Sequence, residues 1–285
     1  MDSNYIYIFI FCILLLFILL IINKNNNINN NELFNTELVK NKIAFLFLIY
    51  DEINHEEIWK LFFNSIDKNE YNIYIHYKDY KKSEYFDKYK LENIIPTTWG
   101  EISLVKAHNL LLEEALKDKN NIHFILLSNS CIPFKKFNYI YNYLDNNFSY
   151  YNISSNPNYE RTTDSLKYIT KNDIKKASQW SILNRKHATL LVNDKNKYIN
   201  WFTVYPDEYS HITYLYYNKL NNEIIKTTDS KYDATTYTNW DENYLKNYDD
   251  INDHDILLLY NSPCLFGRKF IKNCKNLELL YKLIT

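Results

Sequence analysis

The sequence predicts an α/β fold with a mostly parallel central sheet flanked by helices. Apolar runs at 43–50, 71–76 and 122–127 have the length and composition of buried strands. Amphipathic runs at 56–66 and 103–116 separate these strands and have the spacing of helices with one apolar face. Strands that alternate with helices form parallel sheets covered on both faces, so this order of elements predicts the fold class. In such sheets ligands bind at the carboxyl ends of the strands.

The remaining elements are shorter or less regular. The stretch 221–250 is polar and predicts mostly loops. Ser103 and Asn184 can each cap the helix that follows, because their side chains accept hydrogen bonds from free backbone N–H groups. No internal repeat or second boundary is evident, so residues 42–285 are predicted to form a single domain. Four further elements are predicted: a strand at 179–183 and helices over 185–192, 207–220 and 277–283.

The N-terminus predicts a membrane attachment. Residues from about 5 to 22 form an apolar run without a charge, which at roughly 1.5 Å per residue just spans a bilayer core. No small-residue cleavage site follows, which favours an uncleaved signal anchor over a signal peptide. The stretch from 23 to about 40 is rich in Asn and lacks hydrophobic periodicity, as is typical of a flexible stem. Residues 1–41 are therefore predicted to be anchor and stem.

The composition excludes some classes of partner and site. A net charge of -1 and a pI near 6.7 leave no polybasic surface, which argues against nucleic acid binding. No two of the four cysteines have the spacing of a metal site, and the three in the main body cannot all pair with one another. The 28 Tyr and only 2 Gly suit an AT-rich genome, such as that of a protist or a large DNA virus.

The stretch from Val204 to Tyr209 carries the most suggestive chemistry. Pro206 suits the first turn of a helix, where free N–H groups and the helix dipole favour the carboxylates of Asp207 and Glu208. Such an environment keeps a base ionised near neutral pH. Acidic residues in a first turn are also ordinary caps, so these residues alone do not establish catalysis.

Seven short blocks, taken in their order, resemble glycosyltransferase family 14. This family includes the core 2/I-branching β-1,6-N-acetylglucosaminyltransferases, the peptide O-xylosyltransferases and plant core 2-like proteins, and the resemblance is closest to the plant branch. It covers about residues 42 to 272. The blocks are Lys42–Tyr50, Tyr74–His76, Trp99-Gly100 with Ser103–Val105, Phe124–Pro133, Ser178–Trp180, Pro206–Glu208 and Leu265–Phe270.

The resemblance implies a GT-A-type fold and an inverting transfer from a UDP-sugar by a single-pass Golgi protein. It implies that Glu208 is the general base and that Lys269 contacts the donor diphosphate, with Lys246 near the position of a second diphosphate-binding residue. The sequence departs from the animal enzymes at two positions. Cys131 stands where they have an Asp, and Lys78 stands near their uridine-contacting Asp. The identity of the donor therefore does not carry over.

The residue types fit this chemistry. Inverting transfer needs one base for the acceptor hydroxyl, which Glu208 can supply, and positive charge for the departing diphosphate. Arg268 and Lys269 can supply that charge, since one cation about 4 Å from a phosphate contributes up to ~4 kcal/mol at an effective dielectric of about 20. Two such cations could replace a metal, as the resemblance implies, so no metal cofactor is expected. A metal-dependent alternative would use Asp253 and Asp255, although their place before an apolar run favours a helix cap.

Other residues have a functional and a structural interpretation. His76 ends a strand and is assigned with Trp180 to the donor side, while Trp99 and Asp207 are assigned to the acceptor side. A buried structural histidine and aromatic core packing are the ordinary alternatives. Cys131 is expected to be buried structure, because no base lies beside it in the sequence.

The sequence therefore predicts a membrane-anchored, metal-independent, inverting glycosyltransferase. We expect it to move GlcNAc or xylose from a UDP-sugar to a hydroxyl of a glycan or glycoprotein, as a type II protein in the Golgi or another secretory lumen. The alternative is an inactive membrane protein of the same fold that binds glycans or nucleotide sugars. The departures at Cys131 and Lys78 motivate this alternative.

Overall fold

The computed structural model describes residues 18, 20, 40–64, 66–81, 83–227, 235–241 and 244–285. The chain divides into residues 1–40 and a compact unit over 41–285. The predicted anchor at 5–22 lies outside the described residues except at two positions, and nearly all of the stem lies outside them too. Within the part of the chain that the structure describes, no helix has both the length and the apolar character needed to cross a membrane.

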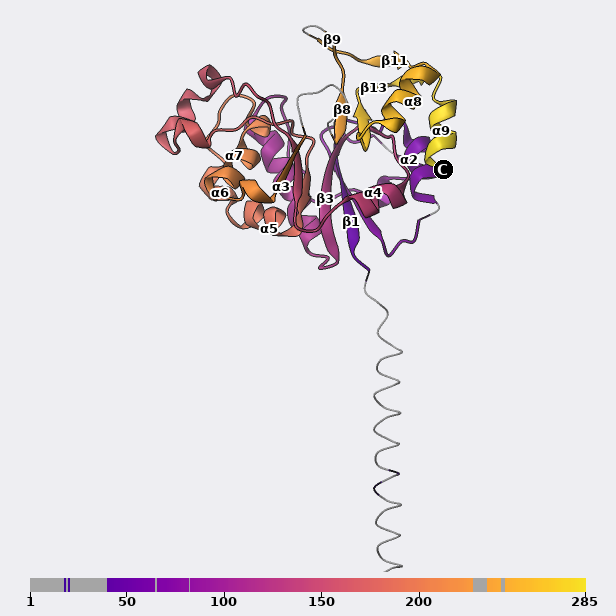
Figure 1. The fold of residues 1–285 in the computed structure, drawn as a ribbon, viewed down its shortest axis with the longest axis horizontal. Helices are drawn as coiled ribbons and strands as arrows, with labels where there is room; N and C mark the ends of the chain where they lie inside the picture. The colour runs from indigo at the N-terminus through magenta and orange to yellow at the C-terminus, as the bar shows by residue number, and fades with distance from the viewer. Residues whose placement is uncertain are drawn as a thin grey trace, which may run out of the picture. The chain divides into compact units, whose positions relative to one another are not determined.

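A six-stranded sheet with the order β2-β1-β3-β6-β5-β7 forms the centre of the compact unit (Figure 1). Strand β1 is parallel to both of its neighbours and β5 is parallel to β7, while β6 is antiparallel to β3 and β5. Five strands thus run one way, which confirms the predicted α/β fold with a mostly parallel sheet. The strands are β1 (Lys42–Ile49), β2 (Tyr71–Tyr77), β3 (Asn121–Ser128), β5 (Ser149–Asn152), β6 (Ile182–Asn184) and β7 (Ile224–Thr227).

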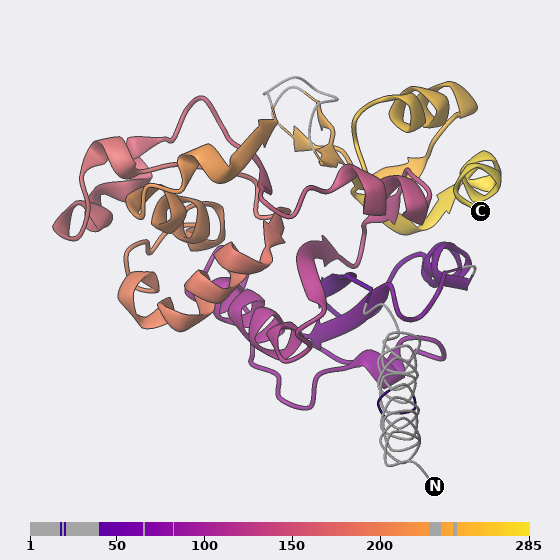
Figure 2. The ribbon, with the colours of Figure 1, turned by 60° about the horizontal axis from the view of Figure 1, so that its bottom comes forward.

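Helices cover both faces of this sheet, because β1 is apolar on both sides. Ala44 and Leu46 belong to one core cluster, and Phe45 and Phe47 to the other. Helices α3, α5, α6 and α7 lie on one side, and α2 and α4 on the other (Figures 1 and 2). The helices are α2 (Glu56–Asn64), α3 (Ile102–Leu116), α4 (Phe137–Tyr143), α5 (Arg185–Asn193), α6 (Lys195–Tyr198) and α7 (Ser210–Tyr217).

A third core cluster organises the C-terminal region beside the sheet. Its small sheet pairs β12 with β4 and β8, so the stretch 265–270, which we call the closing motif, is held against the turn that follows β3. The remaining elements are the strands β4 (Ile132–Pro133), β8 (Thr236–Thr238), β9 (Trp240–Asp241), β10 (Tyr244–Leu245), β11 (Tyr248–Asp250), β12 (Phe266–Arg268) and β13 (Phe270–Lys275), the helices α8 (Asp253–Asn261) and α9 (Glu278–Ile284), and five 3₁₀ helices, η1 (Asp87–Tyr89), η2 (Tyr159–Lys167), η3 (Lys171–Asp173), η4 (Pro206–Glu208) and η5 (Asn221–Glu223).

Several local predictions need correction. The helix predicted over 207–220 is two elements, η4 and α7, separated by Tyr209, so its two carboxylates lie in a one-turn helix of their own. Ser103 is not the cap of α3, because that helix begins at Ile102 and the Ser103 hydroxyl accepts a hydrogen bond from the Thr98 N–H (2.8 Å). The Asn184 cap is confirmed by a hydrogen bond from the backbone N–H of His187 (2.8 Å).

The described parts of the stretch 221–250 contain more strand than its polarity predicts. Strand β7 extends the central sheet by pairing with β5, and β8 joins the small sheet. Both gain their stability from partners far away in the sequence, which the polarity of the stretch does not reveal.

We expect Gly267→Ala to lower the free energy of unfolding by about 1–3 kcal/mol, because a Cβ at this position overlaps the ring of Phe134. Urea unfolding of both proteins measures the difference. In the double variant with Phe134→Leu, the smaller side chain leaves room for the new methyl group. The double variant should then lose less stability than the sum of the losses of the two single variants. Strict additivity of the two losses would contradict a clash with this ring.

Candidate active site

The turn Pro206–Glu208 is fixed by backbone contacts on both sides. Tyr205 adopts the left-handed conformation (φ 47°), and its N–H donates to the carbonyl of Gly100 (3.1 Å), itself at φ 74°. The N–H of Glu208 donates to the Tyr205 carbonyl (3.0 Å), and the Glu208 carbonyl accepts from the Ala177 N–H (2.9 Å). The turn therefore joins the loop before α3 to the segment before β6.

The Glu208 carboxylate lies at the surface of this turn. Its side chain is 33% exposed, and its Oε2 lies 3.2 Å from Nζ of Lys176, which is 26% exposed. An exposed ion pair of this kind contributes at most about 1 kcal/mol. The carboxylate can therefore leave Lys176 for a polar group of a ligand at small cost.

Asp207 differs from its neighbour. Its Oδ1 is buried and has no hydrogen-bond partner. Burial, with a smaller contribution from the charge of Glu208, raises the pKa of Asp207 to about 6. The prediction that helix-start geometry favours both ionised carboxylates is therefore wrong for Asp207, because η4 turns this side chain into the protein.

The cations of the closing motif are partly or almost wholly buried. The Arg268 guanidinium lies over the ring of Trp180 (4.3 Å to the centroid), and its Nε is buried without a hydrogen-bond partner. Burial lowers the pKa of Arg268, and burial together with the charge of Arg268 lowers the pKa of Lys269. Arg268 is thus partly buried and held on Trp180, which is 6% exposed beneath it.

A short segment, Ala177–Trp180, connects Glu208 with Arg268. We call it the bridging segment. Ala177 binds the backbone of Glu208 at one end, and Trp180 supports Arg268 at the other. Three steps of extended chain cover at most about 10 Å, so the two ends of the segment are no farther apart than that. The structure therefore brings the predicted base and a predicted cation to the two ends of one small region.

The closing motif is anchored at the carboxyl ends of β1 and β3. The Phe270 N–H donates to the carbonyl of Ser130 in the turn after β3 (3.0 Å), and its carbonyl accepts from Nδ2 of Asn54 in the loop after β1 (2.7 Å). Cys131 in the same turn is fully buried, as expected, and its thiol interacts electrostatically with Arg268. Arg268 thus lies at the edge of the sheet where parallel α/β folds bind ligands.

Lys246 is connected to the closing motif through Tyr248. Its Nζ is above the ring of Tyr248 (5.2 Å), which stacks on Phe270 (4.8 Å). The N–H of Tyr248 donates to the carbonyl of Lys269 (2.8 Å). The loose sequence assignment of Lys246 therefore finds a physical connection to the closing motif.

His76 and Lys78 lie at the end of β2. His76 is fully buried, its Nε2 accepts from the Ile95 N–H (3.0 Å) and its Nδ1 has no partner. Desolvation lowers the pKa of His76, so the ring is neutral and its free proton is on Nδ1. Lys78 lies over the ring of Tyr50 (4.7 Å).

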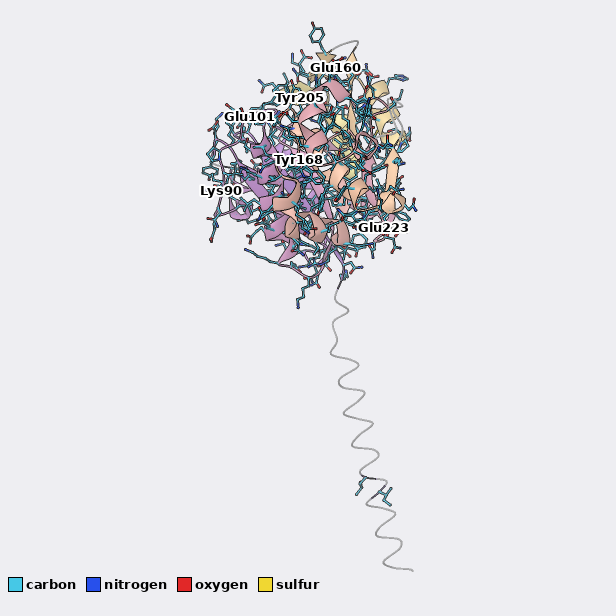
Figure 3. All side chains as sticks on the ribbon, turned by 90° about the vertical axis from the view of Figure 1, so that its left-hand side faces the viewer. Lys90, Glu101, Glu160, Tyr168, Tyr205 and Glu223 are labelled. Atoms are coloured by element: carbon cyan, nitrogen blue, oxygen red, sulfur yellow. The ribbon has the colours of Figure 1, made fainter. Side chains whose placement is uncertain are left out.

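Trp99 stands out on the Glu208 side as a large aromatic residue that is 79% exposed. It packs edge-to-face on Tyr205 (5.2 Å), and the guanidinium of Arg161 lies over the same tyrosine (5.1 Å). The face that carries Tyr205 also carries Glu101 and Glu160 (Figure 3). Sequence reasoning missed Tyr205 and Arg161, although Tyr205 directly precedes the motif that it helps to shape.

The acidic pair of the metal-dependent alternative starts a helix. Asp253 and Asp255 lie in the first turn of α8, and Oδ1 of Asn252 accepts the Asp255 N–H (2.8 Å). The interpretation as a helix start is confirmed, with Asn252 as the cap. Among the described residues, no three or more His, Cys, Asp or Glu are grouped as metal ligands. In the same part of the chain Cys131, Cys264 and Cys274 form no disulfide.

Sequence reasoning also missed a buried polar group beneath the turn. His108 of α3 and His211 of α7 face each other with ring centroids 4.7 Å apart, and His211 Nε2 is 2.9 Å from Oδ1 of Asn109. These histidines could have been found from the sequence as polar residues on the core-facing sides of predicted helices, because such side chains are rarely buried without a partner.

Comparison with known proteins now adds to this geometry. The family model of the Core-2/I-branching enzyme matches residues 43–274. The chain belongs to this family. Membership confirms the resemblance given by the seven sequence blocks, and it confirms the expected class of enzyme, a glycosyltransferase, at the level of the family.

Two individual proteins illustrate the relationship. Glycosyltransferase BC10 of Oryza sativa subsp. japonica is 29% identical over 163 residues, which are 54% of this chain and 41% of the rice protein. The match thus spans about two fifths of that relative's length. A crystal structure of galactosyltransferase LgtC in complex with donor and acceptor sugar analogs matches with a TM-score of 0.40 and 6% identity, over 79% of this chain and 86% of that one. A likeness this distant carries no argument about the site.

The buried carboxyl of Asp207 gives a prediction about stability. Its pKa is raised from 3.8 to about 6 in the folded protein. The folded state therefore binds this proton more tightly than the unfolded state, and stability is lost as pH rises from about 4 to 6. We expect Asp207→Asn to be more stable than the wild type by up to about 3 kcal/mol at pH 7 and to lose that advantage near pH 4.

Urea unfolding between pH 4 and pH 8 measures this difference. The exposed Asp164, which lies 3.6 Å from Lys167, provides the matched control Asp164→Asn. A pH-independent difference between Asp207→Asn and the wild type would show that burial does not disfavour the charge of Asp207.

Proposed function

We propose that the protein is an inverting glycosyltransferase that moves GlcNAc or xylose from a UDP-sugar to a hydroxyl of a glycan or glycoprotein. Family membership supports the class of reaction. The single observation that carries the assignment of residues is the bridging segment, which has Glu208 at one end and Arg268 at the other. Inversion requires that base and diphosphate lie on opposite sides of one sugar, and the bridging segment connects the elements that carry these two groups.

In this mechanism Glu208 takes the proton of the acceptor hydroxyl. The hydroxyl oxygen forms the new bond to the anomeric carbon while the bond from that carbon to the diphosphate oxygen breaks, and the electron pair leaves with the diphosphate. Glu208 is one-third exposed, so it can return the proton to solvent after each turnover. Its pairing with Lys176 is weak enough to be replaced by the acceptor.

Arg268, Lys269 and Lys246 balance the charge of the departing diphosphate. Arg268 is already held in place by Trp180, and its Nε is a free donor. A fixed charge in a partly dry site contributes more than one in water and does not need to reorganise during the reaction. We propose that these side chains serve in place of a metal ion.

The acceptor approaches over Trp99, which is exposed and packs edge-to-face on Tyr205. The Trp99 ring offers an apolar face of the kind that sugar rings stack on, next to η4. His76 lies near the carboxyl edge on the donor side and offers its free Nδ1–H to a ligand. The GT-A character of the fold, implied by the resemblance, belongs to the same proposal.

A second candidate is an inactive protein of this fold that binds glycans or nucleotide sugars. The ion pair between Lys176 and Glu208 favours it, since a nearby positive charge stabilises the ionised carboxylate and makes it a weaker base. The departures at Cys131 and Lys78 point the same way.

We expect Glu208→Gln to reduce transfer by at least about 100-fold, because the amide cannot accept the acceptor's proton. The measurement is release of UDP and formation of product with a panel of UDP-sugars, with and without EDTA. Glu114→Gln is the matched control, since Glu114 pairs with Lys117 at the far end of α3. Activity should survive both EDTA and the control variant.

Two results would change the proposal. Loss of activity in EDTA would show that a metal ion, and not the cationic side chains, balances the charge of the diphosphate. If the wild type binds a UDP-sugar but does not turn it over, the result favours the inactive binding protein.

We also propose that residues 5–22 anchor the protein in a secretory membrane, with the domain in the lumen. The charge-free apolar run supports this. We expect the full chain to remain in the membrane pellet after alkaline carbonate extraction, and a variant lacking residues 1–41 to be released. Extraction of the full chain by carbonate would rule out the anchor.

The sequence Asn147-Phe148-Ser149 is an acceptor site for N-glycosylation, and Asn147 is exposed. We expect it to be glycosylated in that lumen. The measurement is an increase in mass of the wild type that is absent in Asn147→Gln.

A further inference from the structure

Unpartnered polar atoms gather beside Glu208. The described residues contain nine buried side-chain N or O atoms without a hydrogen-bond partner. Three of these nine belong to residues that line one small pocket: Nε2 of His108, the hydroxyl of Tyr151 and Oδ1 of Asp207. Because native proteins rarely leave such atoms unpaired, their concentration in one place needs an explanation.

The pocket is built from rigid elements. His108 comes from α3, Tyr151 from β5, and Asp207 from η4, while Gln179 belongs to the bridging segment. His108 and Tyr151 are only 6% and 2% exposed. The side chain of Ser181 lies next to the Tyr151 hydroxyl and interacts with it, but the contact does not have the geometry of a full hydrogen bond. We call this space the Asp207 pocket.

The protonation states define what the pocket can bind. Burial lowers the pKa of His211 to about 3 and that of His108 well below its ordinary value, so both rings are neutral. Neutral His108 therefore offers its Nε2, which donates or accepts according to the tautomer, and Tyr151 offers a hydroxyl that both donates and accepts. Asp207 offers an acceptor oxygen. A group that donates and accepts at once would satisfy all three.

The size and position of the pocket limit which ligand group can enter it. It has room for a single group about as large as a water molecule, and Glu208 lines its wall. Ala177, Ser178 and Gln179 of the bridging segment line it together with Ser181, while the ring of Trp180 lies beneath Arg268. In an inverting transfer the base meets the acceptor opposite the diphosphate, so a ligand group that reaches the pocket beside Glu208 comes from the acceptor.

We propose that the Asp207 pocket is a specificity subsite that receives one non-reacting hydroxyl of the acceptor sugar. The hydroxyl donates to Oδ1 of Asp207 and accepts from Tyr151 or His108, while the neighbouring hydroxyl of the same sugar meets Glu208. The inference rests on the proposed function and adds the class of group that the enzyme selects.

The experiment uses the full chain and a panel of aryl galactosides, glucosides and N-acetylgalactosaminides together with their monodeoxy analogues. We expect Tyr151→Phe to raise the acceptor KM by roughly tenfold, because one hydrogen bond to the sugar is lost. Tyr150→Phe is the matched control. Tyr150 is the neighbour on β5, and its hydroxyl accepts the N–H of Asp145 (2.8 Å) in the core on the other face of the sheet.

The monodeoxy acceptors test the contact directly. One of them should lose roughly tenfold in kcat/KM with the wild type and should lose little more with Tyr151→Phe, since the residue and the hydroxyl share one interaction. The KM for the UDP-sugar and the rate of its hydrolysis should be the same in Tyr151→Phe and the wild type.

The possible failures are distinguishable. If transfer occurs, but Tyr151→Phe matches the wild type and every deoxy acceptor is used equally by both, the pocket holds only a structural water and the inference is overturned. If no UDP-sugar is hydrolysed or transferred by the wild type, the proposed function fails and the subsite with it. A raised KM for the donor would also overturn the inference, because it would place the pocket on the wrong side of the sugar.

Discussion

The arrangement of the site depends on the bridging segment being held at both ends. Its first residue donates a backbone hydrogen bond to Glu208, and its last places an indole ring beneath Arg268. Neither contact is strong by itself, since a backbone hydrogen bond contributes about 1 kcal/mol and a desolvated cation–π contact about 2. Together they connect the element that carries the proposed base with the element that carries a proposed diphosphate cation, which an inverting transfer needs on opposite sides of one sugar.

The same region keeps polar atoms in costly places. Asp207, His108 and Tyr151 have buried atoms without partners, and so has Arg268 at the other end. Each such atom costs about 1–3 kcal/mol in the unliganded protein. The large apolar clusters on both faces of the sheet offset this cost. Such a distribution, with a well-packed scaffold and unsatisfied groups along one edge, is what a binding site requires of a fold.

Local patterns predicted the scaffold well. The apolar run of β1 and the alternation of strands and helices gave the correct class of fold, because burial on both faces leaves a direct mark on a strand. The Asn184 cap was also predictable, because a cap contacts only its own helix and is therefore local in sequence. Strand β7 was missed because its pairing with β5 is long-range and its sequence is polar. The single helix predicted over 207–220 was wrong, because Tyr209 separates η4 from α7.

The sequence by itself determined the type of fold, the family and the chemical identity of the candidate residues. Periodicity and the order of short motifs are properties of neighbouring residues, and they need no knowledge of distant contacts. Only the tertiary structure decided how these residues work. Oδ1 of Asp207 is buried and the pKa of this carboxyl is raised, while the carboxylate of Glu208 beside it is one-third exposed, although both stand in the same motif. Arg268 is fixed on Trp180 by a contact between segments far apart in the chain. Burial and long-range contact set the charge and position of each group, and no stretch of sequence contains either.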